Sequence, residues 1–141
     1  DFSGADLTGA AMVQTMLMFA RFSNAILTRV NFAGADLRGA DMTGALLTGS
    51  NLSGSHFEPA TLTKKDAQNK NRTWRTNLSG ADLTGANLGG AGLVDANLTG
   101  ANLTGANLAR SKLTGAMVDG AKFSGAIFRD ATLPNGRPHK S

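Results

Sequence analysis

The sequence contains no cysteine and no tyrosine, and it has one tryptophan and two histidines. The absence of cysteine excludes disulfide bonds and thiolate metal sites. No apolar run approaches the roughly 18 residues of a membrane-spanning helix, so no transmembrane segment is predicted. His56 and His139 stand outside any cluster with ligand spacing, and we therefore expect neither a metal site nor a cofactor.

Glycine, alanine, leucine, threonine and asparagine make up much of the chain. There are 18 glycines among the 141 residues, and 41% of the chain is hydrophobic. A disordered chain has few apolar residues, so this low complexity favours a repeat within a single domain. Asp1 already lies inside the repeat. We therefore expect the native chain to begin earlier, which leaves the compartment open between cytoplasm and lumen or periplasm.

An apolar residue recurs every five positions from Phe2 to Leu62 and again from Leu78 to Leu133, in 13 and then 12 units. A small residue, usually alanine, stands two positions before it, Asp or Asn often lies between them, and glycine often ends the unit. This period fits neither a helix nor a half-buried strand. It predicts a short extended segment followed by a turn, because Gly, Asn and Asp favour turns.

The segment ADLTGANLGGAGLVDANLTGANLTGANL (residues 81–108) resembles the pentapeptide-repeat family, whose pattern is A(D/N)LXX. The likeness implies an all-β fold, a right-handed quadrilateral parallel β-helix (solenoid) with four units per coil and about six coils. Within one continuous domain, we expect N-terminal and C-terminal halves of the helix at residues 1–64 and 76–135. A basic loop insertion at 65–75 would separate them, and residues 136–141 would form a tail.

The segment TKKDAQNKNRTWR (Thr63–Arg75) breaks the period. Leu62 and Leu78 are 16 residues apart, so the break is not a whole number of degenerate units. Burying its arginines would be costly, which predicts a loop that leaves the helix. Its charged residues sum to +4, the whole net charge of the chain, and come from Lys64, Lys65, Asp66, Lys70, Arg72 and Arg75. Together with Trp74, the basic residues form a candidate interaction loop; the alternative is a solvated loop with Trp74 folded over the helix edge.

Two further surfaces follow from the register. A candidate exposed apolar patch comprises Val13, Met16, Met18 and Phe19, which would contact a partner or lie under a segment preceding Asp1. A candidate basic patch comprises Arg110, Lys112, Lys122 and Arg129. If the coils stay in register across the break, then Ile26, Leu46 and Met117 share one face and form a weaker apolar stripe.

The function predicted from the sequence is a non-enzymatic protein-interaction or scaffold module. Its partner would be another protein or a second copy. Four aspartates could be paired carboxylates, but they occupy the Asp/Asn position of the repeat, where turn formation explains them: Asp6, Asp36, Asp41 and Asp82. No set of catalytic residues stands out. The likeness extends to thylakoid-lumen, cyanobacterial and other bacterial members. It also allows a quinolone-protecting DNA mimic that binds a topoisomerase, DNA gyrase, although a net charge of +4 disfavours a mimic of DNA. A second alternative is nucleic-acid or anionic-surface binding through the basic loop; nucleic acid is the less favoured partner.

Overall fold

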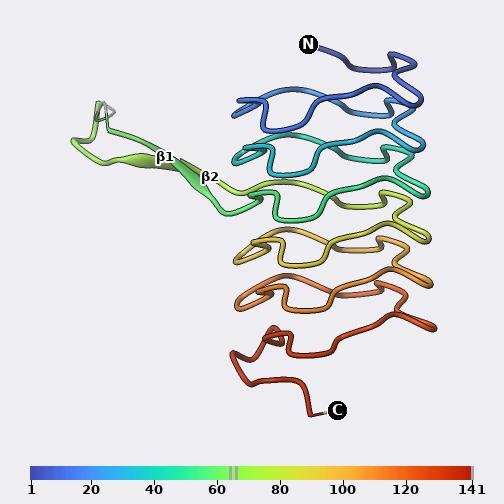
Figure 1. Cartoon of the computed structure of the whole chain (residues 1–141). Helices are drawn as coiled ribbons and strands as arrows, with labels where there is room; N and C mark the ends of the chain where they lie inside the picture. The colour runs from blue at the N-terminus through green and yellow to red at the C-terminus, as the bar shows by residue number, and fades with distance from the viewer. Residues whose placement is uncertain (64, 66, 141) are drawn as a thin grey trace.

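The structure is a computed structural model that describes residues 1–63, 65 and 67–140; Lys64, Asp66 and Ser141 lie outside the described residues. The chain winds into a stack of coils with its two ends at opposite ends of the stack, and one hairpin projects from the side (Figure 1). The hairpin contains strands β1 (Ala60–Leu62) and β2 (Arg72–Trp74). Along the stack, extended segments pair through single bridging residues.

Each coil contains four of the five-residue units. Parallel bridges join residues 20 apart, such as Asp6 with Ile26 and Asn87 with Asn107. Backbone hydrogen bonds run between the same coils, as from the Leu83 N–H to the Asn102 carbonyl at 2.7 Å. Twenty residues are four units, so the coil has four sides. We number the sides one to four by the units of the first coil, centred on Phe2, Leu7, Met12 and Leu17.

The apolar and small residues of each unit fill the interior. Leu83, Leu103 and Ala101 are fully buried, and the same holds for most residues in these two positions. Burial of one leucine contributes roughly 1.5–3 kcal/mol relative to exposure. Residues of the end coils, such as Phe2 and Phe128, are only partly buried because they have neighbours on one side. The five-residue period therefore predicted these core residues correctly, with Leu62 as the exception described below.

The corners of the coil require a left-handed backbone. The residue two positions after the inward apolar residue has positive φ, as at Gly85 (64°) and Gln14 (54°). Where Asp or Asn precedes the corner, its side chain accepts a hydrogen bond from the N–H two residues later; Asn102 Oδ1 does so from Thr104 at 3.1 Å. Pro59 falls in the corner position. Proline is restricted to φ near −65°, so the chain cannot turn there and leaves the stack.

The prediction that Leu62 points into the core is wrong. Leu62 lies on β1 and is 43% exposed, and the inward series ends at Phe57. Bridges across the break join residues 36 apart, such as Asp41 and Asn77, which is 16 more than one coil. Leu78 therefore takes the place on side one that the period assigns to Leu62. Leu62 is five residues after Phe57 and so matches the spacing of the repeat, but this match is a coincidence.

This change of register moves Met117 to a different side. Ile26 and Leu46 pair with each other on side two, as expected. Met117 instead pairs with Asn97 on side one. The prediction of a common face for Ile26, Leu46 and Met117 is therefore wrong, because it counted Leu62 as one unit of the rod.

The C-terminal residues fold back on the last coil. Gly136 forms a turn with φ of 77°, and the Leu133 N–H donates to the Arg137 carbonyl at 2.7 Å. The His139 N–H donates to the Ala131 carbonyl at 2.8 Å, and its ring stacks on Phe128 with centroids 5.4 Å apart. These contacts cover part of the final sheet edge, which would otherwise present unpaired backbone groups.

Thr76 closes the stack where the hairpin leaves it. At an ordinary corner the glycine N–H donates to a carbonyl of the next coil, as from Gly34 to Ser53 at 2.9 Å. At the break, the Gly39 N–H donates instead to the buried Thr76 hydroxyl at 2.9 Å. That hydroxyl lies 3.2 Å from the Leu37 carbonyl and 3.4 Å from the Glu58 carbonyl. One side chain thus links both sides of the gap.

Replacing Thr76 with valine should destabilise the chain by about 1–3 kcal/mol, because the Gly39 N–H loses its acceptor inside the protein. Replacing Thr76 with serine keeps the hydroxyl and should cost less. Denaturant unfolding followed by circular dichroism measures both changes. Equal stability of the two variants would contradict the bridging role of the hydroxyl.

Candidate interaction surfaces

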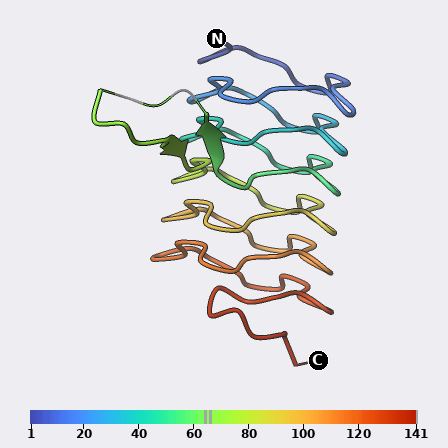
Figure 2. The same cartoon turned by 90° about the vertical axis from the view of Figure 1, so that its left-hand side faces the viewer.

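The hairpin projects from the corner between sides four and one. Its antiparallel register pairs Ala60 with Trp74, Thr61 with Thr73 and Leu62 with Arg72. The two threonine hydroxyls lie 2.9 Å apart. Figure 1 shows the two strands extending away from the side of the stack, and Figure 2 views the molecule from that side.

Aromatic packing attaches the hairpin to the stack. The rings of Phe19 and Trp74 meet edge to face with centroids 5.4 Å apart. Phe19 and Ala60 also close over Gly39: a Cβ on that glycine would lie 3.0 Å from the Phe19 ring and 3.1 Å from the Ala60 Cβ. Gly39 has φ of 69°, so both its conformation and its surroundings require glycine. Trp74 therefore lies over the edge of the stack.

The described basic residues of the candidate interaction loop are exposed, namely Lys65, Lys70, Arg72 and Arg75. The Arg72 guanidinium lies over the Trp74 ring, 5.6 Å from its centroid. Arg75 donates a hydrogen bond to the Asp95 carbonyl of the next coil at 3.4 Å. Lys64, the remaining basic residue of this prediction, lies outside the described residues. The hairpin thus turns an apolar surface toward the stack and a basic surface toward solvent.

Replacing Phe19 with alanine should loosen the hairpin without unfolding the stack. A two-stranded hairpin is marginally stable alone, so it depends on this contact. Trp74 is the chain's one tryptophan. We expect a red shift of its fluorescence, faster amide exchange at Thr73, and a melting temperature within a few degrees of the unmodified chain. Val13→Ala removes an exposed apolar side chain elsewhere in the same coil and serves as the control; identical spectra for both variants would contradict the anchoring role.

The candidate apolar patch is divided among several contacts. Met16 is 85% exposed and Val13 is 48% exposed. Met18 is half-buried, and its sulfur accepts a hydrogen bond from Arg38 at 3.7 Å. Phe19 is partly covered by Trp74. The hairpin therefore shields one end of the patch, and Met16 is its most exposed member.

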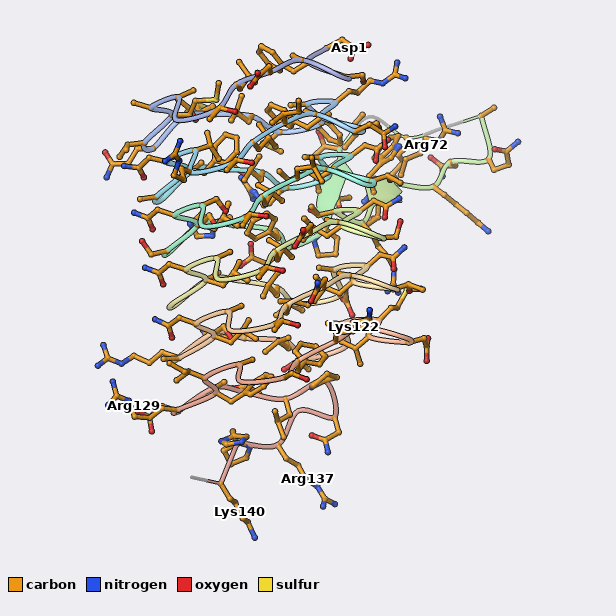
Figure 3. All side chains as sticks on the ribbon, turned by 90° about the vertical axis from the view of Figure 1, so that its right-hand side faces the viewer. Asp1, Arg72, Lys122, Arg129, Arg137 and Lys140 are labelled. Atoms are coloured by element: carbon orange, nitrogen blue, oxygen red, sulfur yellow. The ribbon has the colours of Figure 1, made fainter. Side chains whose placement is uncertain are left out.

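The candidate basic patch does not form one surface. Lys122 lies on side two and Lys112 on side four, which are opposite sides of the coil. Arg110 and Arg129 lie together, because the Arg110 N–H donates to the Arg129 carbonyl at 2.8 Å. Figure 3 shows Lys122 and Arg129 well apart on the surface. Only the arginine pair of the four predicted residues borders a common hollow.

Polar side chains on side four form a separate network. Arg38 binds Asp36 at 2.6 Å, and this hydrogen bond holds the pKa of the Asp36 carboxyl below its usual value. His56 Nδ1 lies 3.5 Å from Glu58 Oε2. The Glu58 carboxylate fills the space beside Gly92 that a larger side chain would need. The network therefore packs charges against the coil surface rather than around an open cavity.

The aspartates of the repeat act as turn residues. The hydroxyl of Thr84 donates to Asp82 at 2.6 Å, and this bond lowers the pKa of the Asp82 carboxyl. Thr8 does the same for Asp6. A general acid at neutral pH requires the opposite shift. Among the described residues, no group of three or more His, Cys, Asp or Glu side chains is placed to hold a metal ion.

The stacked four-sided coils, with leucine, phenylalanine and alanine inside, define a repeat protein of the β-helix class. The sequence model of the Pentapeptide repeats family matches residues 1–32, 15–54, 25–63, 73–93 and 91–130. The chain belongs to the pentapeptide-repeat family. Its fold is accordingly the right-handed quadrilateral β-helix of that family, as the likeness of the sequence implied.

Solved structures of several family members are similar to this chain. HetL, a pentapeptide repeat protein involved in heterocyst differentiation regulation in the cyanobacterium Nostoc sp. strain PCC 7120, is 30% identical. The match covers 97% of this chain and 65% of HetL, with a TM-score of 0.52. A pentapeptide repeat protein from the Arabidopsis thaliana thylakoid lumen is 32% identical over 82% of this chain and 66% of its own, with a TM-score of 0.35. The chain thus spans slightly less than two thirds of each of these relatives.

A trypsin-treated form of QnrB1, a plasmid-mediated fluoroquinolone resistance protein, is 24% identical. This match covers 94% of the chain and 67% of QnrB1, with a TM-score of 0.41. No curated protein matches the sequence. In the part of the chain that the structure describes, no helix could cross a membrane.

Proposed function

We propose that this chain is a non-enzymatic protein-interaction module, a rod of about six coils that presents its basic hairpin to a protein partner. One observation carries the proposal: the hairpin is held on the rod by Phe19 and Trp74, while its basic residues face solvent. Loops held on a rigid scaffold are common binding elements. The Phe19–Trp74 contact therefore holds the base of the hairpin against the rod in the chain without a partner.

The filled interior supports a role without catalysis. Leu88, Leu93 and Leu108 are fully buried, so the centre of the rod is packed rather than hollow. The carboxyl groups of Asp6 and Asp82 are held as anions by their turns. An enzyme needs a concave site with reactive groups of tuned pKa. The side chains of the rod instead serve turns, packing and surface charge.

The charge distribution favours a protein over nucleic acid. Outside the candidate interaction loop, nine basic residues balance nine acidic residues, so the rod offers no continuous basic track. Trp74 packs against Phe19 on one side and Arg72 on another, which limits stacking on a nucleic-acid base. A DNA mimic directed at gyrase would need a strongly acidic surface, whereas the net charge is +4. An acidic protein surface fits the hairpin better.

Site-specific photo-crosslinking tests this proposal. A photoreactive amino acid replaces Leu62 on the exposed face of the hairpin, and in a matched control it replaces Ile127, which is 52% exposed on the rod. In an extract of the source cells we expect a discrete product from the hairpin position. Replacing Lys65, Lys70 and Arg72 with glutamine should abolish that product. A product of twice the chain's mass would identify a second copy as the partner, and equal products from both positions would overturn the proposal.

A further inference from the structure

A polar hollow lies on side three of the rod, away from the hairpin. It has a volume of about 330 Å³, and Gly89, Gly90 and Ala109 line it together with asparagine and arginine side chains. The position after the inward leucine commonly holds threonine, as at Thr84 and Thr104. At the hollow, the residue after the inward leucine is Gly89 in one coil and Ala109 in the next. The missing side chains create the space.

Two arginines border the hollow. Arg110 is at a left-handed corner with φ of 61°, and its N–H binds the Arg129 carbonyl of the next coil. In the described part of the chain, the ion pairs involve Arg21, Arg38 and His56, and neither Arg110 nor Arg129 takes part in one. Asp130 follows Arg129 but pairs with neither arginine within 4 Å in that same part. Two guanidinium groups therefore remain available beside the hollow.

The hydrogen-bonding groups of the hollow also suit an anion. Asn87 Oδ1 accepts from the Gly89 N–H at 3.0 Å and from Asn107 Nδ2 at 3.3 Å. Asn107 Oδ1 accepts from the Ala109 N–H at 3.0 Å. The side-chain oxygens of both asparagines are thus occupied inside the protein. The backbone N–H groups of Gly89, Gly90 and Ala109 also donate inside the protein. The donors that remain beside the hollow are the guanidinium groups and the side-chain N–H groups of the two asparagines, and with them the positive charge.

From this arrangement we infer that the Arg110–Arg129 hollow binds an oxyanion, a carboxylate or a phosphate group. Guanidinium groups bind both of these anions through paired, charge-assisted hydrogen bonds. The volume is at the lower end of the range for small-molecule sites, which suits one anionic group rather than an extended ligand. This site shares no residue with the hairpin. Anion binding at the hollow therefore does not depend on whether the hairpin binds a protein partner.

Amide chemical shifts of the full chain, followed by NMR, test the inference. The probes are inorganic phosphate, citrate and a tetraglutamate peptide, each added at constant ionic strength because salt screens exposed charges. We expect saturable shifts at Gly89, Gly90 and Ala109. Saturation by phosphate alone would assign a phosphate ligand, and saturation by citrate and the peptide alone would assign a carboxylate. Saturation by all three also supports the site, and saturation by none would overturn it.

Three variants separate a built site from general attraction to positive charge. Arg110→Gln and Arg129→Gln should each weaken binding about tenfold, as expected for a lost charge-assisted hydrogen bond. Gly89→Thr fills the hollow without changing charge and should also abolish saturation. Thr104 occupies the equivalent place after Asn102. At Gly89 a Cβ would lie 3.1 Å from Asn87 Oδ1, so that side chain shifts slightly to admit threonine.

Lys122→Gln provides the matched control, since it removes one positive charge on side two of the rod. We expect its affinity for each probe to stay within about twofold of the unmodified chain. A loss equal to that of Arg110→Gln would overturn the inference and indicate a response to net charge. Undiminished binding by Gly89→Thr would overturn it equally, because the hollow would then be unnecessary.

Discussion

Replacing Leu103 with lysine should unfold the C-terminal half of the rod. Leu103 is fully buried and sits between coils whose inward residues are also leucine and phenylalanine. An ammonium group placed there has no partner and no water, which costs several kcal/mol or more. The stability of a repeat rod is close to a sum of contacts between neighbouring coils. One disrupted coil therefore removes support from both of its neighbours.

Circular dichroism and amide exchange measure this outcome. We expect a lower melting temperature, loss of part of the β signal, and faster exchange at residues such as Leu98 and Leu108 than at Leu27. Met117→Lys is the control, because it adds the same charge at an outward position that is 40% exposed and that lysine already occupies in the neighbouring units, at Lys112 and Lys122. It should leave the melt nearly unchanged. An unaltered melt for Leu103→Lys would show that the inward register is wrong.

The core residues could be predicted from the sequence because each five-residue unit contains the local signals that mark its inward residue and its corner. The five-residue spacing marks the inward residue, and the glycine two positions later marks the left-handed corner. Both signals are local, so they identify Leu83 or Leu103 without knowledge of distant contacts. The four-sided coil came from the family likeness. The bridges between residues 20 apart agree with it.

The break was harder to predict because Leu62 continues the local pattern. Its exposure depends on Pro59, which occupies a position where the corner needs positive φ. That proline was visible in the sequence, and it was the signal that could have placed the exit at Pro59 instead of after residue 64. Thr76 likewise stands where alanine is usual, and its hydroxyl replaces a carbonyl at the gap. In the sequence, Pro59 and Thr76 appear only as departures from the repeat. Their roles follow from the left-handed geometry of the corner.

The surfaces depend on which residues stack above one another, and a shift of one unit rearranges them. Met117 changed sides for this reason. Lys122 and Arg129 both follow the break, so the shift does not separate them. Lys122 lies on side two, whereas Arg110 and Arg129 both follow side-three residues and lie together. The hollow itself had a signal in the sequence, the pair Gly89-Gly90 in place of the usual Thr-Gly. A glycine at one position leaves a cavity only when the residue directly above or below it, in the neighbouring coil, is also small. Ala109 meets this condition, and sequence spacing alone did not show it.

Removing residues 60–75 and replacing Pro59 with glycine should produce an uninterrupted rod. The deletion is 16 residues long, equal to the excess of the bridge offset over one coil. Thr76 then follows the corner directly, and Leu78 stands five positions after Phe57. The new glycine can adopt the left-handed corner that proline cannot. We expect a β-rich spectrum like that of the full chain and a melting temperature at least as high.

The same deletion removes the entire net charge, since the segment carries five basic residues and one acidic residue. We therefore expect an isoelectric point near neutrality and loss of direct binding to the partner that crosslinking identifies, while phosphate or citrate binding at Arg110 and Arg129 persists. The matched control keeps Pro59 in the shortened chain. It should melt several degrees lower, because the corner is then forced away from its left-handed conformation.

Unfolding of the glycine variant would contradict this account, because it would make the hairpin part of the stabilising core. The contact between Phe19 and Trp74 would then support the upper coils, and not only the hairpin. A folded rod that retains the partner would instead locate binding on the coil surface, where Met16 is the most exposed apolar side chain. A folded rod that has lost the partner but still binds the anion would show that the hairpin and the hollow are two independent sites on one scaffold.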